Sequence, residues 1–171
     1  QMDSGRAIDD KISDAADVGF DGNRPTVALL GYPDQGNLGM GYLAAVLERR
    51  GYSAQLIDSR DTPETILERL VKIQPVVVGF SLIFQFFLPQ YRQLAIYLRE
   101  AGIGSHFTIG GHYPSLCHDE LLVNFPEIDS VVRYEGEETL IELADKLRTG
   151  GDWRAIHGIA YLLDGQVTAT E

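Results

Sequence analysis

Four short stretches that contain glycine, polar or acidic residues could bind a ligand. They are residues 34–39 (DQGNLG), 81–84 (SLIF), 110–113 (GGHY) and 135–137 (EGE), and each follows an apolar run. Glycine lets a backbone approach a ligand closely and adopt φ values that other residues resist. We therefore predict a ligand-binding site and identify no catalytic residue. The candidate binding residues are Asp34, Gln35, Gly36, Asn37, Leu38, Gly39, Ser81, Leu82, Ile83, Phe84, Gly110, Gly111, His112, Tyr113, Glu135, Gly136 and Glu137.

Five apolar runs separated by helical patterns must position these stretches. Because parallel strands need right-handed crossovers, usually helices, this alternation predicts an α/β fold. Five such units favour a flavodoxin-like, doubly wound, five-stranded parallel sheet in the order 2-1-3-4-5, with a ligand at the carboxyl ends of strands one and three. The predicted strands cover residues 26–32, 53–58, 75–81, 106–111 and 128–134, and the predicted helices cover 38–50, 63–73, 88–101, 115–125 and 135–150.

The chain divides into three parts. Residues 1–24 are polar and acidic, with weak helical periodicity, and we expect a tail or a packing helix there. Residues 25–151 form the α/β domain, in which Thr62 and Ser115 are the expected N-caps of two helices and residues 112–114 the loop before the second. Residues 152–171 contain two alternating stretches around Asp-Gly, a pattern that predicts a β-hairpin extension.

Composition excludes several classes of protein. The chain has 171 residues, 44% of them hydrophobic, and a formal net charge of -11, so a polyanion such as nucleic acid would be repelled. No apolar run approaches the roughly 20 residues that span a bilayer, and the N-terminus lacks the apolar core of a secretion signal. The single cysteine, Cys117, cannot form an internal disulfide or a Cys-rich metal site. We expect a cytoplasmic protein without membrane or nucleic-acid partners.

The same fold serves several ligands, and three of them fit the loops poorly. A phosphoacceptor receiver domain needs an aspartate at the end of strand three, where this chain has Ser81. A flavodoxin needs a Ser/Thr-rich phosphate loop after strand one, and residues 33–39 contain neither residue type. A dinucleotide fold needs Gly-x-Gly-x-x-Gly, whereas Gly36, Gly39 and Gly41 have another spacing.

The loops together resemble the cobalamin-binding domain family. Many of its members carry Asp-x-His-x-x-Gly, then Ser-x-Leu, then Gly-Gly, and this chain has DQGNLG, SLI and Gly110-Gly111. The 41 residues between Gly39 and Ser81 and the 26 between Ile83 and Gly110 match the family intervals. The resemblance implies bound cobalamin, whose dimethylbenzimidazole tail would slide between strands one and three past small residues.

One departure from the family concerns the position below cobalt. Gly36 stands where the family has its cobalt-ligating histidine, so the resemblance implies a base-off cobalamin with no histidine ligand. His112 is the only histidine beside the predicted site, and either it binds cobalt or a corrin side chain or it is a solvated loop residue.

Longer stretches resemble the front domain of cobalamin-dependent radical SAM enzymes. These are NLGMGYLAAVLERRGYSAQLID, VVVGFSLIF, GGHYPSL and IDSVVRYEGEETLIEL, within residues 26–168. The likeness implies that this chain presents cobalamin to a radical SAM domain that follows in the full enzyme and carries SAM and an iron–sulfur cluster, whose Cys-x-x-x-Cys-x-x-Cys motif is absent here. Methyl transfer to an unactivated centre is the implied reaction, and this domain is not catalytic alone. The alternative is a docking or sensing domain of the same fold that binds no corrin.

Overall fold

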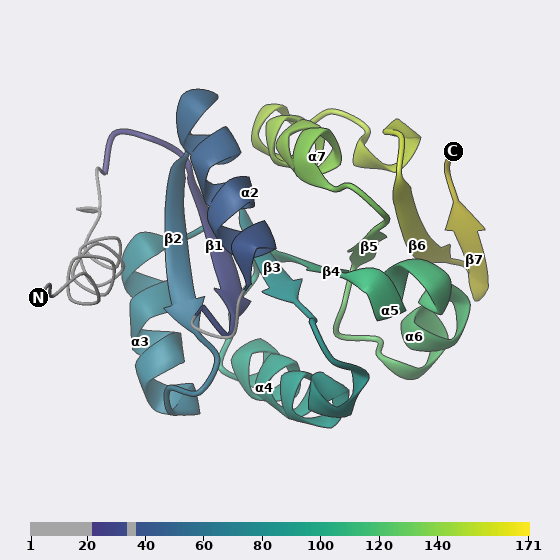
Figure 1. The fold of residues 1–171 in the computed structure, drawn as a ribbon, viewed down its shortest axis with the longest axis horizontal. Helices are drawn as coiled ribbons and strands as arrows, with labels where there is room; N and C mark the ends of the chain where they lie inside the picture. Colours follow the sequence, from purple (N-terminus) through teal and green to yellow (C-terminus); the bar gives the residue numbers. More distant parts are fainter. Residues whose placement is uncertain (1–21, 34–36) are drawn as a thin grey trace, which may run out of the picture.

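A computed structural model describes residues 22–33 and 37–171, which form a three-layer α/β structure around one sheet (Figure 1). The described sheet has seven strands in the order β2-β1-β3-β4-β5-β6-β7. The first five are parallel, as predicted, and β6 and β7 are antiparallel. The strands are β1 (Thr26–Gly31), β2 (Ser53–Asp58), β3 (Val77–Ser81), β4 (His106–Gly110), β5 (Ser130–Val132), β6 (Ile159–Leu163) and β7 (Gln166–Ala169).

Helices cover both faces of the sheet, which explains why the central strands are apolar on both sides. In Figure 1, α2 and α7 lie over one face, and α3 and α4 lie over the other. Each face has its own core of buried side chains. The helices are α2 (Leu38–Arg49), α3 (Pro63–Ile73), α4 (Leu88–Glu100), α5 (His112–Leu116), α6 (His118–Asn124) and α7 (Glu137–Thr149), with 3-10 turns η2 (Gln85–Phe87) and η3 (Trp153–Ala155).

Local capping explains where several of these helices begin and end. Thr62 caps α3 as predicted, because its side chain accepts a hydrogen bond from the Thr65 N–H at 3.2 Å. Gly150 ends α7 in the left-handed conformation. The expected cap at Ser115 is wrong, because residues 112–114 are not a loop but the first turn of α5, where Pro114 fits without needing an N–H partner.

The C-terminal hairpin extends the sheet itself. β6 pairs antiparallel with β5, with Val132 opposite Ile159, and β7 follows after a tight turn. Asp164 and Gly165 both have positive φ, 50° and 78°, as a two-residue type I′ turn requires. The five-stranded parallel sheet and its hairpin extension are therefore confirmed. The predicted tail or packing helix lies almost entirely outside the described residues.

Among the described helices, none is both long enough and apolar enough to span a bilayer.

Candidate functional site

A groove of about 420 Å³ opens at the carboxyl edge of the sheet, between the first turns of α2 and α7. Its floor is formed by β3 and β4. Because alternate residues of a strand face the same side, Gly79 and Ser81 share this face with Thr108 and Gly110. Their side chains are short or absent, so the space that larger side chains would fill stays open to a ligand.

Most of the predicted binding residues converge on this groove. Those that line it are Asn37, Gly39, Ser81, Leu82, Ile83, Gly110, Gly111, His112, Glu135, Gly136 and Glu137. They come from four loops that are far apart in sequence, which is the convergence that a parallel sheet predicts for residues after its strands. Asp34, Gln35 and Gly36 fall outside the described residues.

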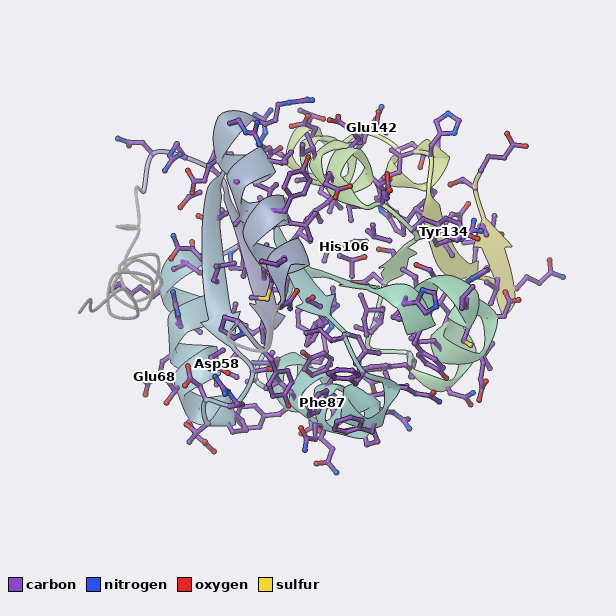
Figure 2. The ribbon with its side chains drawn as sticks, in the orientation of Figure 1. Asp58, Glu68, Phe87, His106, Tyr134 and Glu142 are labelled. Carbon is purple, nitrogen blue, oxygen red and sulfur yellow. The ribbon has the colours of Figure 1, made fainter. Side chains whose placement is uncertain are left out.

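Three predicted residues lie elsewhere. The Leu38 side chain is 85% exposed and is not among the residues that line the groove. Phe84 packs beside Phe87, with ring centroids 6.2 Å apart, and Phe87 lies on the α4 side of the sheet (Figure 2). Tyr113 packs against the core of that same side. The sequence places these residues after the right strands, but the direction of each side chain depends on the packing of the following helix.

The expected path for a tail between strands one and three is closed along their paired length. β1 and β3 are hydrogen-bonded neighbours from Val27–Val77 to Leu30–Phe80, so no gap separates them there. The groove instead runs over the face of β3 and β4, beneath α2 and α7, because the small residues stand on those two strands.

Asn37 ties the loop after β1 to the end of β3. It caps α2, accepting a hydrogen bond from the Met40 N–H at 3.1 Å on Oδ1. Its Nδ2 donates to the Ser81 Oγ at 3.2 Å. One side chain therefore fixes both the start of α2 and the hydroxyl at the mouth of the groove.

Replacing this residue by alanine should be costly. Asn37→Ala removes the cap and the bond to Ser81, and we expect the free energy of unfolding to fall by about 1–2 kcal/mol in urea titrations. Asn37→Asp keeps the capping acceptor and should recover part of that loss. Equal stabilities of the alanine variant and the wild type would contradict the capping role.

Glycine allows a close approach at the other wall of the groove. A Cβ built on Gly136 would lie 2.5 Å from Cγ1 of Val132, so only glycine lets α7 begin this close to β5. Glu137 then opens α7, where the helix dipole favours an acid.

In the part of the chain that the structure describes, no three His, Cys, Asp or Glu side chains gather as a metal site.

Sequence reasoning missed eight residues that line the groove. A two-residue step back along the strands from Ser81 and Gly110 would have found Gly79 and Thr108. Tyr134 gave no signal, because its left-handed backbone, with φ of 58°, is visible only in the structure. The missed residues are Leu29, Leu43, Gly79, Phe80, Thr108, Val132, Tyr134 and Leu140.

A hydrogen-bonded chain of side chains leads from the groove floor at Thr108 through Ser130 to the half-buried His106. His106 Nε2 is 2.8 Å from the Ser130 Oγ, which donates to the Thr108 Oγ1 at 2.8 Å. Figure 2 shows His106 near the middle of the molecule, and its ring meets the Trp153 ring of η3 edge-on at 4.7 Å. Burial lowers the pKa of His106 to about 4, so its imidazole is neutral at neutral pH.

This burial predicts a loss of stability in mild acid. The unfolded chain holds a histidine of pKa about 6.5 and binds a proton before the folded chain does. The contribution of the neutral His106 to the free energy of unfolding is therefore complete above pH 6.5 and is lost as the pH falls towards 4. We expect it to remove about 2–3 kcal/mol of unfolding free energy across that interval. His106→Gln should flatten the pH dependence measured by urea titration, and a slope as steep as that of the wild type would refute this origin.

Comparison with known proteins places the chain in a family. A family model described as the B12 binding domain matches residues 26–144. The anaerobic magnesium-protoporphyrin IX monomethyl ester cyclase of Synechocystis sp. is 30% identical over 138 residues, covering 78% of this chain and 28% of that protein. The chain therefore spans little more than a quarter of this curated relative.

Solved structures show the same fold. The radical S-adenosylmethionine methyltransferase TsrM from Kitasatospora setae superposes with a TM-score of 0.74 at 22% identity, over 86% of this chain and 30% of that one. The cobalamin-dependent S-adenosylmethionine radical enzyme OxsB, solved with aqua-cobalamin and S-adenosylmethionine, gives a TM-score of 0.71 at 23% identity, over 87% of this chain and 22% of that one. With the family model matching well over half of its length, this chain belongs to the B12-binding domain family.

Proposed function

We propose that this chain binds cobalamin with its nucleotide tail in the groove over β3 and β4 and presents it to a radical SAM domain of a longer protein. The observation that carries the proposal is the run of small residues on the groove floor, Gly79, Ser81, Thr108 and Gly110. Membership of the B12-binding domain family supports the same ligand.

The groove fits the tail in size and character. Its volume of about 420 Å³ lies within the range of roughly 300–1,000 Å³ that is usual for small-molecule sites. Its walls are apolar, with Leu29, Val132 and Leu140 facing a space that suits a benzimidazole base. A Cβ built on Gly79 would lie only 3.1 Å from Cδ2 of Leu29, so even a methyl group there would narrow the groove.

Residues at the mouth would hold the rest of the cofactor. Ser81, Gly110 and Gly111 would border the tail where it enters, and His112 would meet a corrin side chain. The carboxylates of Glu135 and Glu137 are acceptors for corrin amides or contacts for the neighbouring domain. The protein's part is to bind and orient the group.

The cofactor would supply the chemistry. Bound cobalamin would carry a methyl group on its way from SAM to an unactivated carbon or phosphorus of the substrate. Methyl transfer is our preferred reaction because TsrM is a methyltransferase, whereas the curated relative from Synechocystis is a cyclase. The SAM and the iron–sulfur cluster would belong to the following domain, towards which residues 152–171 would lead.

The test is uptake of the cofactor by the purified chain. After incubation with hydroxocobalamin and desalting, the protein fraction should carry the visible spectrum of cobalamin in a ratio near one per chain. Free cobalamin passed down the same column without protein is the control. A colourless protein would overturn this proposal in favour of a docking or sensing domain that binds no corrin.

The coordination of cobalt gives a separate prediction. Because Gly36 replaces the family histidine, we propose a base-off cobalamin whose lower position holds water or nothing. The electron paramagnetic resonance spectrum of the cob(II)alamin form should then show no strong nitrogen hyperfine splitting. Triplet splitting would show coordination by His112 or by the tail base, and His112→Ala would tell these two sources apart.

A further inference from the structure

We infer that the inner end of the groove selects corrinoids by their lower base, accepting an apolar benzimidazole and disfavouring a purine. The methyl group of Thr108 would be the selecting feature. The side-chain hydrogen bonds that link His106 to Ser130 and Ser130 to Thr108 would hold this methyl group in place. This inference rests on the proposed function, since it concerns the same groove.

The inner end lies two residues below the mouth along the strands. Ser81 and Gly110 stand at the carboxyl ends of β3 and β4, whereas Gly79 and Thr108 lie opposite each other one step further in. The base is the part of the nucleotide tail farthest from the corrin ring, so it would reach this end.

The two sides of Thr108 face different neighbours. Towards β3, its Cγ2 methyl would lie 4.0 Å from a Cβ built on Gly79, so the methyl borders the groove. Towards β5, its Oγ1 donates to the Ser130 carbonyl oxygen at 3.1 Å and accepts from the Ser130 Oγ at 2.8 Å. The polar side of this residue is therefore turned away from the ligand.

The direction of the protons follows from the hydrogen-bond chain. Each hydroxyl has a single proton, and that of Ser130 is committed to Thr108. His106 must therefore donate from Nε2 to the Ser130 Oγ, as a neutral imidazole protonated at that nitrogen does. Because Ser130 and Thr108 are buried, rotation of either hydroxyl would leave a polar atom without a partner.

An apolar inner end discriminates between bases. The methyl groups of Leu29 and Thr108 flank the position above Gly79, with Val132 and Leu140 among the other lining residues. Dimethylbenzimidazole in the base-off state has one free ring nitrogen and would lose a single hydrogen bond to water there. The amino group and ring nitrogens of adenine would lose their hydrogen bonds to water and find no donor or acceptor on these side chains, a penalty that sites without partners impose on polar ligands.

The experiment compares dissociation constants for three corrinoids by equilibrium dialysis with the wild-type chain. These are cobalamin, the cobamide whose lower base is adenine, and cobinamide, which lacks the nucleotide tail. We expect cobalamin to bind about 10-fold to 100-fold more tightly than the adenine cobamide. Equal binding of the two would overturn this inference and leave the proposed function standing, whereas failure to bind any corrinoid would overturn both.

Variants test the parts played by the methyl group and the chain. Thr108→Ser removes the methyl and should lower the preference for cobalamin by about 5-fold or more, whereas Thr108→Val keeps a methyl there and should retain it. Ser130→Ala removes the hydroxyl that donates to Thr108, so the Thr108 side chain can rotate and the preference for cobalamin should fall. Adding Thr108→Val should restore the preference, because valine has no hydroxyl that could rotate into the groove. Thr168→Ser, the same change at an exposed position of β7, is the control. If Thr108→Ser keeps the wild-type preference for cobalamin, the role of the methyl group is refuted. If Ser130→Ala keeps it, the role of the hydrogen bonds that hold Thr108 is refuted.

Discussion

Gly110→Trp should abolish cobalamin uptake while leaving the fold intact. A Cβ on Gly110 would meet the Val132 carbonyl oxygen at 3.5 Å, an ordinary contact, so the backbone accepts a side chain there. The indole would then fill the mouth of the groove, since Gly110 lines it. We expect the dissociation constant for cobalamin to rise by about 100-fold or more, because a well-packed site does not expand to admit an added ring.

Two comparisons make this result specific to the tail. Cobinamide has no nucleotide tail, so its affinity should change much less in the same variant. Gly104→Trp places the same side chain at the opposite end of the sheet, where a Cβ would meet nothing within 4 Å, and should leave uptake unchanged. Thermal unfolding of both variants would verify that each is folded. Normal cobalamin binding by Gly110→Trp and by Ser81→Trp would mean that the tail lies elsewhere.

The sheet was predictable because its signals are local. Apolar runs such as TVALLG are buried on both faces, and Thr62-Pro63 begins α3 as the capping pattern predicts. Strand order followed from the number of units, since parallel strands need crossovers of one hand. The convergence of four loops then followed from the sheet alone, because the carboxyl ends of parallel strands share one edge.

The shape of the groove was not predictable in the same way. Its position depends on which strands carry small residues on the α2 and α7 face, and Gly79 and Thr108 attract no attention as isolated residues. Leu38 and Phe84 follow the right strands, yet Leu38 is exposed and Phe84 packs beside Phe87. Side-chain direction after a strand depends on the angle of the next helix, which is a property of tertiary packing rather than of sequence spacing.

Gly111→Ala should destabilise the protein more than any other single methyl group added in the groove. Gly111 has φ of 132°, a conformation that costs an L-residue energy, and an added Cβ would lie 2.2 Å from the Leu82 carbonyl oxygen. The Leu82 backbone is held in place on its other side, since the Leu82 N–H donates to the Gly110 carbonyl at 2.9 Å. We expect a loss of about 3 kcal/mol or more in the free energy of unfolding, measured in urea.

The adjacent Gly110→Ala is the matched comparison, because the same methyl group one residue earlier meets only ordinary contacts and should cost about 1 kcal/mol or less. The difference should also reach the binding site. The Gly111 carbonyl oxygen accepts a hydrogen bond from the Ser115 Oγ at 2.8 Å, and the Ser115 Oγ in turn accepts one from the Tyr134 N–H at 2.8 Å. Gly111 therefore fixes α5 relative to the end of β5. Moving it would displace His112 and Tyr134 together at the mouth. Equal losses of stability in the two alanine variants would show that the crowding against Leu82 is relieved at little cost, and the mouth of the groove would then be less rigid than this geometry implies.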